Sequence, residues 1–405
     1  MQSASFREKR AEYERAINTA FSPHSPINEA RFFAGRTEQV RAVVDTIQTP
    51  GLHAAIYGER GVGKTSLANI IKDYLGGQIV GVSRVNCSQQ DTFESVIRRS
   101  LSAFQLSMSH PLIGFGQREE STVREVLELL PQDGTTLSPD AVAALLAQLP
   151  PHFVLVIDEF DRLPREETAA FADFIKSLSD RGASSTVVLV GVAEDIDALI
   201  LSHASVERCL RQIPLQRMSE DELSEIIDRG LEATGFALAS DAPRKRILSV
   251  SQGFPHYTHL LAQHAARTAL DSERTTIEDE DVVAGMKTAV ERADQSHREL
   301  YYKATTGTKK RNLWREVVAA CALADTDERG YFSTRAVQDR LSEILGRHII
   351  QQTLAYHLGK LTEDNRGPLL QRVGPERRYR YRFLNPLMRP FITMKAMNDG
   401  LIHPQ

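Results

Sequence analysis

Residues 58–65 restrict the possible folds of this chain more than any other segment. They read Gly-Glu-Arg-Gly-Val-Gly-Lys-Thr, which fits the pattern G-x4-G-K-[S/T]. A short apolar run, 54–57, precedes them, and a helical pattern, 66–75, follows them. In this strand–loop–helix context the pattern forms a phosphate-binding loop. The sequence therefore predicts a nucleotide site at this loop.

Each residue type in the loop has a chemical reason. Glycines let backbone N–H groups turn inward around phosphate oxygens, and the start of the following helix favours anions. Lys64 can reach the β- and γ-phosphates of ATP, and the Thr65 hydroxyl can bind Mg²⁺. The candidate nucleotide contacts in the loop are Gly58, Gly61, Val62, Gly63, Lys64, Thr65 and Ser66.

Apolar runs alternate with helical patterns through the first half of the chain. Five runs are expected to be strands, at 54–57, 79–85, 153–157, 187–190 and 213–215. Short apolar runs separated by helices predict an α/β fold with a parallel sheet covered on both faces. Residues 108–138 are rich in Ser, Gly, Pro and Thr, and we expect a surface insertion there without regular elements.

The third of these runs ends in two acidic residues. Asp158 and Glu159 follow four apolar residues, about 90 residues after the phosphate loop, as in a Walker B element. Asp158 is expected to hold Mg²⁺, directly or through water, and Glu159 to orient and deprotonate the attacking water. A solvated strand end is the alternative for this pair, and Asp161 is expected to be a helix cap or a surface residue.

These motifs resemble those of AAA+ and STAND-type P-loop ATPases over about residues 31–292. Residues 32–38, Phe-Phe-Ala-Gly-Arg-Thr-Glu, resemble the segment that lies beside the adenine in origin-recognition and STAND ATPases. Residues 253–255, Gly-Phe-Pro, resemble the lid turn whose proline abuts the nucleotide, although an ordinary helix-breaking turn is the alternative. The resemblance implies four further nucleotide contacts, Phe33, Gly35, Arg36 and Pro255.

Two positions depart from the AAA+ pattern. Residues 191–194 lack the Asn, Thr or Ser that often senses the γ-phosphate, and His256 stands where many members carry a sensor arginine. Slow hydrolysis is therefore expected. The family also places an arginine finger before the last strand, directed at a neighbouring subunit, and Arg208 is favoured over Arg211 here. Ordinary surface arginines are the alternative; the first interpretation implies a homo-oligomer.

The C-terminal part has its own pattern and its own charge. Residues 309–390 carry 16 basic and 9 acidic residues, a net charge of +7, whereas residues 1–308 carry −11. Helical patterns at 312–324, 333–345 and 349–362, followed by a hairpin at 369–384, predict a winged helix. The expected architecture is an N-terminal helix and linker (1–30), an ASCE-type P-loop core (31–217), a helical lid (218–304) and a winged helix (310–395).

Period-two alternation in the last strand places arginines on one face and aromatic residues on the other. A winged helix inserts its third helix into the major groove while its wing touches phosphates. The candidate DNA contacts are Arg347, Gln351, Gln352, Lys360, Arg378, Arg380 and Arg382. The alternative is a regulatory winged helix whose arginine wing docks on the acidic run 278–281.

Two functions follow from these patterns. The first is an ATP-controlled oligomeric switch acting on duplex DNA, and the second is a STAND-type signalling ATPase whose nucleotide state gates an effector protein. Both use ATP or ADP with Mg²⁺. The three cysteines lie far apart, no signal peptide is evident, and no apolar run reaches the roughly 18 residues of a membrane span, so a cytoplasmic protein is expected.

Overall fold

A computed structural model describes residues 2–75, 79–111, 119–131, 136–149, 152–192, 196, 204–307, 313–376 and 378–402. Its centre is a five-stranded parallel sheet in the order β2-β5-β6-β1-β7. The strands are β1 (His53–Gly58), β2 (Ile79–Asn86), β5 (His152–Asp158), β6 (Thr186–Gly191) and β7 (Leu210–Leu215). The predicted parallel α/β core is confirmed.

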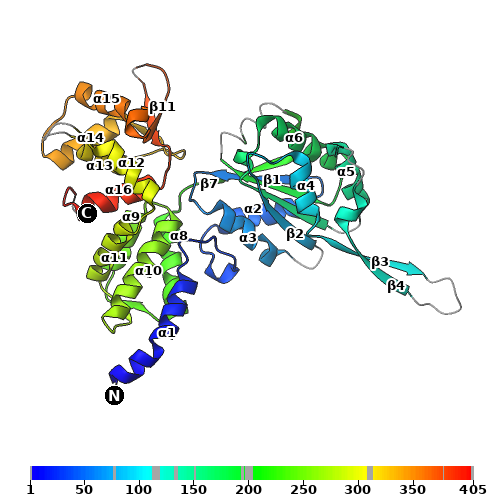
Figure 1. The fold of residues 1–405 in the computed structure, drawn as a ribbon, viewed down its shortest axis with the longest axis horizontal. Helices are drawn as coiled ribbons and strands as arrows, with labels where there is room; N and C mark the ends of the chain where they lie inside the picture. The colour runs from blue at the N-terminus through cyan, green and yellow to red at the C-terminus, as the bar shows by residue number, and fades with distance from the viewer. Residues whose placement is uncertain are drawn as a thin grey trace.

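Helices cover both faces of this sheet (Figure 1). One face packs on α2 (Thr37–Ile47) and α3 (Lys64–Tyr74), and the other on α4 (Phe93–Leu101), α5 (Pro139–Gln148) and α6 (Arg165–Asp180). The apolar cluster on the face of α2 and α3 contains Val154 and Val156 of β5. The cluster on the opposite face contains Leu155 and Ile157. The C-terminal ends of parallel strands lie on the same side of a sheet. The phosphate loop, after β1, and the acidic pair, at the end of β5, therefore lie close together.

A two-stranded antiparallel hairpin extends from the core. Its strands are β3 (Gln105–Pro111) and β4 (Glu119–Glu125), and a short 3-10 helix, η2 (Val126–Leu129), follows them. Figure 1 shows the hairpin projecting away from the sheet. The prediction that residues 108–138 lack regular elements was therefore wrong. Among the described residues, β3 and β4 pair with each other alone. Backbone hydrogen bonds do not depend on apolar side chains, so a composition rich in Ser and Thr does not exclude strands.

A helical region follows β7. It contains α8 (Glu220–Thr234), α9 (Ala242–Ser251), α10 (Pro255–Asp271) and α11 (Asp279–Glu291), with a short pair of strands, β8 (Ala237–Leu238) and β9 (Thr276–Ile277). A capping box opens α8, since the Ser219 hydroxyl accepts the Glu222 N–H and the Glu222 carboxylate accepts the Ser219 N–H.

The first helix of the chain is part of this region. Helix α1 (Gln2–Ala20) packs on α8 and α10, and it buries Ile17 completely. Phe21, which follows it, is also fully buried, and a Cβ added to Gly230 would lie 2.1 Å from its ring. A larger residue at that position would therefore displace α1 from the helical region.

The C-terminal part is a winged helix, as predicted. It contains α13 (Trp314–Leu323), α14 (Thr334–Leu345) and α15 (Gln351–Lys360), and a three-stranded antiparallel sheet of β10 (Phe332–Ser333), β11 (Leu370–Val373) and β12 (Arg380–Phe383). The predicted aromatic face is core, since Phe332, Tyr381 and Phe383 are buried together. No described helix has the length and apolar character that a membrane span requires.

Two flanking helices attach the winged helix to the helical region. Helix α12 (Gln295–Thr305) contacts α13, and α16 (Met388–Asn398) packs on α9 and α11. Buried Arg389 donates to the carbonyls of Ala322 and Ala324, and burial lowers its pKa to about 9. The Tyr257 hydroxyl donates to the Leu387 carbonyl at 2.8 Å, so the two regions share hydrogen bonds as well as apolar contacts.

Candidate nucleotide-binding site

The phosphate loop has the backbone that its glycines allow. Gly61 and Gly63 have φ values of +88° and +98°, which favour glycine. At Gly58 a Cβ would lie 2.1 Å from the Leu215 carbonyl oxygen of the neighbouring strand, so no side chain fits there. The Lys64 ammonium donates to the carbonyls of Gly58 and Glu59, both at 2.9 Å. Burial lowers the pKa of Lys64, and the nearby Asp161 and Asp158 oppose that shift.

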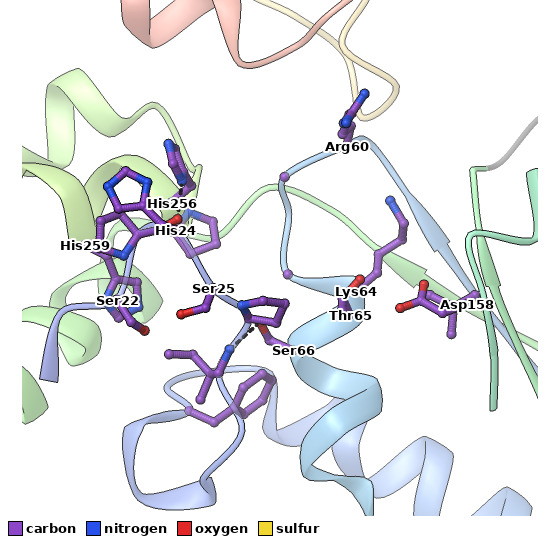
Figure 2. Close-up of a pocket in the computed structure, with 18 of the residues that line it drawn as sticks. Ser22, His24, Ser25, Arg60, Lys64, Thr65, Ser66, Asp158, His256 and His259 are labelled. Atoms are coloured by element: carbon purple, nitrogen blue, oxygen red, sulfur yellow. Dashed lines mark hydrogen bonds between the residues drawn. The ribbon is translucent and has the colours of Figure 1, made fainter. Parts of the chain in front are cut away.

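A cavity of about 370 Å³ lies against this loop, which is within the range of small-ligand sites. Figure 2 shows the phosphate loop with Lys64 and Thr65, the side chain of Asp158, and His256 and His259 of the helical region around this cavity. The predicted site residues that line it are Phe33, Gly61, Gly63, Lys64, Thr65, Ser66, Asp158, Glu159 and Pro255. Pro255 opens α10, and its ring lies 3.9 Å from the position of a Cβ on Gly63.

The acidic pair follows β5 in an unusual backbone conformation. Glu159 is left-handed, with φ +55° and ψ +38°, a conformation that costs energy in a residue other than glycine. Its amide donates to Oδ1 of Asp158 at 2.8 Å, and its carboxylate lies 3.3 Å from the Arg162 guanidinium. Both acids line the cavity.

The residues proposed for Mg²⁺ fit that ion. Asp158 is buried, and its Oδ2 atom makes no hydrogen bond, although it has an ion-pair contact with Arg84. In Figure 2 the Asp158 carboxylate points toward Thr65 at the start of α3. A buried carboxylate oxygen beside a hydroxyl is the kind of ligand set that Mg²⁺ takes.

Four predicted contacts lie outside the cavity lining, namely Gly35, Arg36, Gly58 and Val62. Arg36 is buried behind the loop, where its guanidinium donates to the carbonyls of Val62 and Gln216. Burial lowers its pKa, and the nearby Glu222 opposes that shift. Arg36 therefore joins the loop, the end of β7 and the helical region, and its contact with the nucleotide stays a prediction.

The sequence interpretation missed one wall of the cavity. Residues 22–27 line it, together with His256 and His259 of α10. The Ile27 N–H donates to the Ser66 hydroxyl at 3.1 Å, and His256 Nδ1 lies 2.7 Å from the Pro23 carbonyl oxygen. These contacts use backbone groups, which any residue supplies, so no side-chain pattern marked the segment.

The sensor positions and the arginine-finger candidates lie in different places: His256 lines the cavity, and both candidate fingers lie away from it. Val192 lines the cavity, whereas residues 193–194 lie outside the described residues. Arg208 precedes β7, is 70% exposed and pairs with Asp180 at 2.8 Å. Arg211 is exposed on β7 opposite Ala54, near the start of β1. Both arginines thus lie near the N-terminal ends of the strands, whereas the phosphate loop follows the C-terminal end of β1. Neither arginine lines this cavity.

The arginines of the wing have partners inside their own domain. Arg380 pairs with Asp327 at 2.7 Å, and Arg382 donates to the Gln371 side chain at 2.8 Å. The third helix differs, because Gln351 and Gln352 are exposed at its start. Arg347 and Arg378 are also exposed, and Lys360 pairs with Glu363 at 2.9 Å.

The acidic run 278–281, the alternative partner of the wing, pairs with arginines of the helical region instead. Asp279 pairs with Arg246 at 2.6 Å, and Asp281 with Arg274 at 2.9 Å. Glu278 lies 3.6 Å from the same Arg274. Both arginines belong to the helical region itself, so three of the four acidic residues have partners there without the wing.

A different part of the winged helix reaches the phosphate loop. The Leu387 side chain lies 2.6 Å from the position of a Cβ on Gly61. Arg217, between β7 and α8, holds the Glu59 carboxylate through Nε at 2.6 Å and Nη2 at 2.9 Å. Its Nη1 donates to the Thr326 hydroxyl at 3.4 Å. The chain of contacts Glu59–Arg217–Thr326, which we name the loop latch, therefore joins the phosphate loop to the winged helix.

Comparisons with known proteins show the family and the fold of this chain. A family model described as Novel STAND NTPase 1 matches residues 21–358. The Walker-type ATPase PABY2304 of Pyrococcus abyssi has a similar structure, with a TM-score of 0.53 at 13% identity over 92% of this chain and 99% of that chain. The ORC2 protein of Aeropyrum pernix, solved as ADPNP and ADP complexes, matches with a TM-score of 0.50 at 13% identity over 94% and 98%. A search among curated protein sequences found no match.

Proposed function

Because this chain belongs to the Novel STAND NTPase 1 family, we propose that it is an ATP-controlled switch whose nucleotide state sets the position of its winged helix. The observation that carries this proposal is the loop latch. Lys64, which would meet the phosphates, holds the carbonyl of Glu59, and the side chain of Glu59 holds Arg217. Arg217 in turn reaches Thr326 of the winged helix. A change at the phosphates therefore has a short physical route to the winged helix.

The residues of the cavity have the following roles in this proposal. Lys64 exchanges its two carbonyl partners for phosphate oxygens, and the loop amides surround the same phosphates. Thr65 and Asp158 would hold Mg²⁺, which would neutralise phosphate charge. Glu159 orients and deprotonates the attacking water. Pro255 and the segment 22–27 close the cavity on the other side, and hydrolysis is slow because no Asn, Thr or Ser follows β6 within the described residues 191–192.

Nucleotide release tests the latch. Arg217→Met removes the two hydrogen bonds to Glu59 and the one to Thr326, and we expect ADP to dissociate about tenfold faster, a change of about 1.4 kcal/mol. The measurement is stopped-flow dissociation of a fluorescent ADP analogue. Arg244→Met is the matched control, because Arg244 pairs with Asp228 and Ser224 inside the helical region. An unchanged rate in folded Arg217→Met would refute control through this latch.

We propose two partners that this mechanism would serve. The first is a second copy of the chain, because Arg208 is exposed and lies far from its own phosphate loop, where it could serve a neighbour's nucleotide. An effector protein gated by the winged helix is the second, in keeping with a STAND switch. If Arg208 acts on a neighbour, the turnover per subunit rises with protein concentration; a constant rate from a monomer would exclude that role.

Duplex DNA is a second candidate for the winged helix. The observation in its favour is the exposed start of α15, where Gln351 and Gln352 are exposed and follow exposed Arg347 closely in sequence. Glutamine side chains can read base edges in the major groove, and arginine can hold phosphates. The partners of Arg380 and Arg382 within the domain weaken the case for the wing itself.

A further inference from the structure

One charged side chain beside the acidic pair is unexplained by the roles above. Arg84 lies on β2, which pairs in parallel with β5, and the register places Arg84 opposite Val156 and Asn86 opposite Asp158. Side chains two residues apart on a strand share a face, so Arg84 is the diagonal neighbour of Asp158. Its Nη2 atom lies 3.1 Å from Oδ2 of Asp158, the same oxygen that makes no hydrogen bond.

Arg84 is held in this place from two sides. Its Nη1 donates to the side-chain oxygen of Asn69 on α3, the helix that begins with the phosphate loop. Its Nη2 donates to the side-chain oxygen of Asn86 at 3.0 Å. Asn69 also donates to the side chain of Asn28, at 2.6 Å, next to the segment that lines the cavity. The guanidinium is thus fixed between β2 and α3 beside the carboxylate.

One oxygen of Asp158 therefore faces a hydrogen-bond donor and the other a cation. Oδ1 accepts the Glu159 amide, and Oδ2 faces the Arg84 guanidinium. A Mg²⁺ ion bound at Asp158 would share this carboxylate with a permanent cation a few ångströms away. At such a short separation two like charges repel strongly, even at an effective dielectric constant of about 20.

We propose that Arg84 is a positioning residue that fixes Asp158 and weakens divalent-metal binding there, so that nucleotide binding depends little on Mg²⁺. This inference rests on the proposed nucleotide site. A role in packing alone predicts that shape matters and charge does not. The charge role predicts that Arg84→Lys keeps the wild-type metal affinity while Arg84→Met does not.

The test is Mn²⁺ binding to the full chain with saturating ADP, followed by electron paramagnetic resonance of the free ion. We expect Arg84→Met to bind Mn²⁺ at least tenfold more tightly than the wild type, and Arg84→Lys to stay within threefold of it. Arg98→Met is the control, since Arg98 pairs with Glu94 on α4 and does not reach Asp158. Equal or weaker Mn²⁺ binding by folded Arg84→Met overturns the proposal.

Two further measurements keep the result decisive. The first is ADP affinity in EDTA, which tests the nucleotide site by itself. A wild type that fails to bind ADP refutes the proposed function. The metal effect is then still measured by Mn²⁺ titration without nucleotide. Asn69→Ala serves if Arg84→Met does not fold. It frees one side of the guanidinium, and we expect tighter Mn²⁺ binding of two- to fivefold; no change there also overturns the proposal.

Discussion

The phosphate loop and the outer face of the winged helix both suit phosphate groups, but they are built in different ways. The loop recognises anions with backbone amides, and it is enclosed by residues 22–27, Pro255 and Leu387. The outer face relies on long side chains, of which Gln351 and Gln352 are exposed and Arg380 has an acidic partner. A loop that binds phosphate through backbone amides has its donors in place as soon as it folds. A site made of side chains loses donors when other residues of the protein pair with them.

The largest expected effect is on the enclosed side of this comparison. Glu159→Gln keeps the shape of the side chain and removes the base, so ATP should bind while turnover falls by roughly 10² or more. Single-turnover hydrolysis with a separate binding titration measures both. Glu166→Gln, on the exposed first turn of α6, is the control. Retained turnover would move the base to another residue of the cavity.

A smaller effect is expected from the cation of the loop. Lys64→Ala removes the ammonium that reaches the phosphates, and ATP affinity should fall at least tenfold, or by about 1.4 kcal/mol. Calorimetric titration measures it, with Lys72→Ala at the far end of α3 as the control. Unchanged affinity in folded Lys64→Ala would contradict the assignment of the phosphate loop.

The two regions also differ in how far the sequence determines them. The core strands, the loop and the placement of Asp158 beside Thr65 were predictable, because strand ends and glycine conformations follow from local pattern. The position of Arg36 behind the loop was not predictable, since it depends on the distant residues Gln216 and Val62. The wall at residues 22–27 was missed because its contacts run through backbone groups.

The winged helix shows the same limit more strongly. Its helices, hairpin and aromatic core follow from periodicity, and the structure has them. The partner of Arg380 does not follow, because Asp327 is far from it in sequence and lies outside the predicted hairpin. The loop latch could not be predicted either, since Glu59, Arg217 and Thr326 belong to three separate regions.

The smallest expected effect decides whether the outer face binds duplex DNA. Each phosphate contact contributes about 0.9 to the slope of log affinity against log salt concentration. Arg378 is exposed, so Arg378→Ala should flatten the slope by about 0.9, whereas Arg380→Ala should change it less because Asp327 already neutralises that side chain. Changes at Gln351 or Gln352 should instead alter sequence preference, since base edges are read by such side chains.

One salt titration of duplex binding separates these outcomes, with Arg298→Ala on α12 as a control for an exposed arginine outside the winged helix. Equal flattening by Arg378→Ala and Arg380→Ala would mean that DNA displaces Asp327 from Arg380, so the wing would then be a second phosphate site formed on binding. No salt-dependent binding with either ADP or ATP would leave the enclosed loop as the only phosphate site of the two. The winged helix would then act through the latch contact at Thr326 and through a protein partner, and not through DNA.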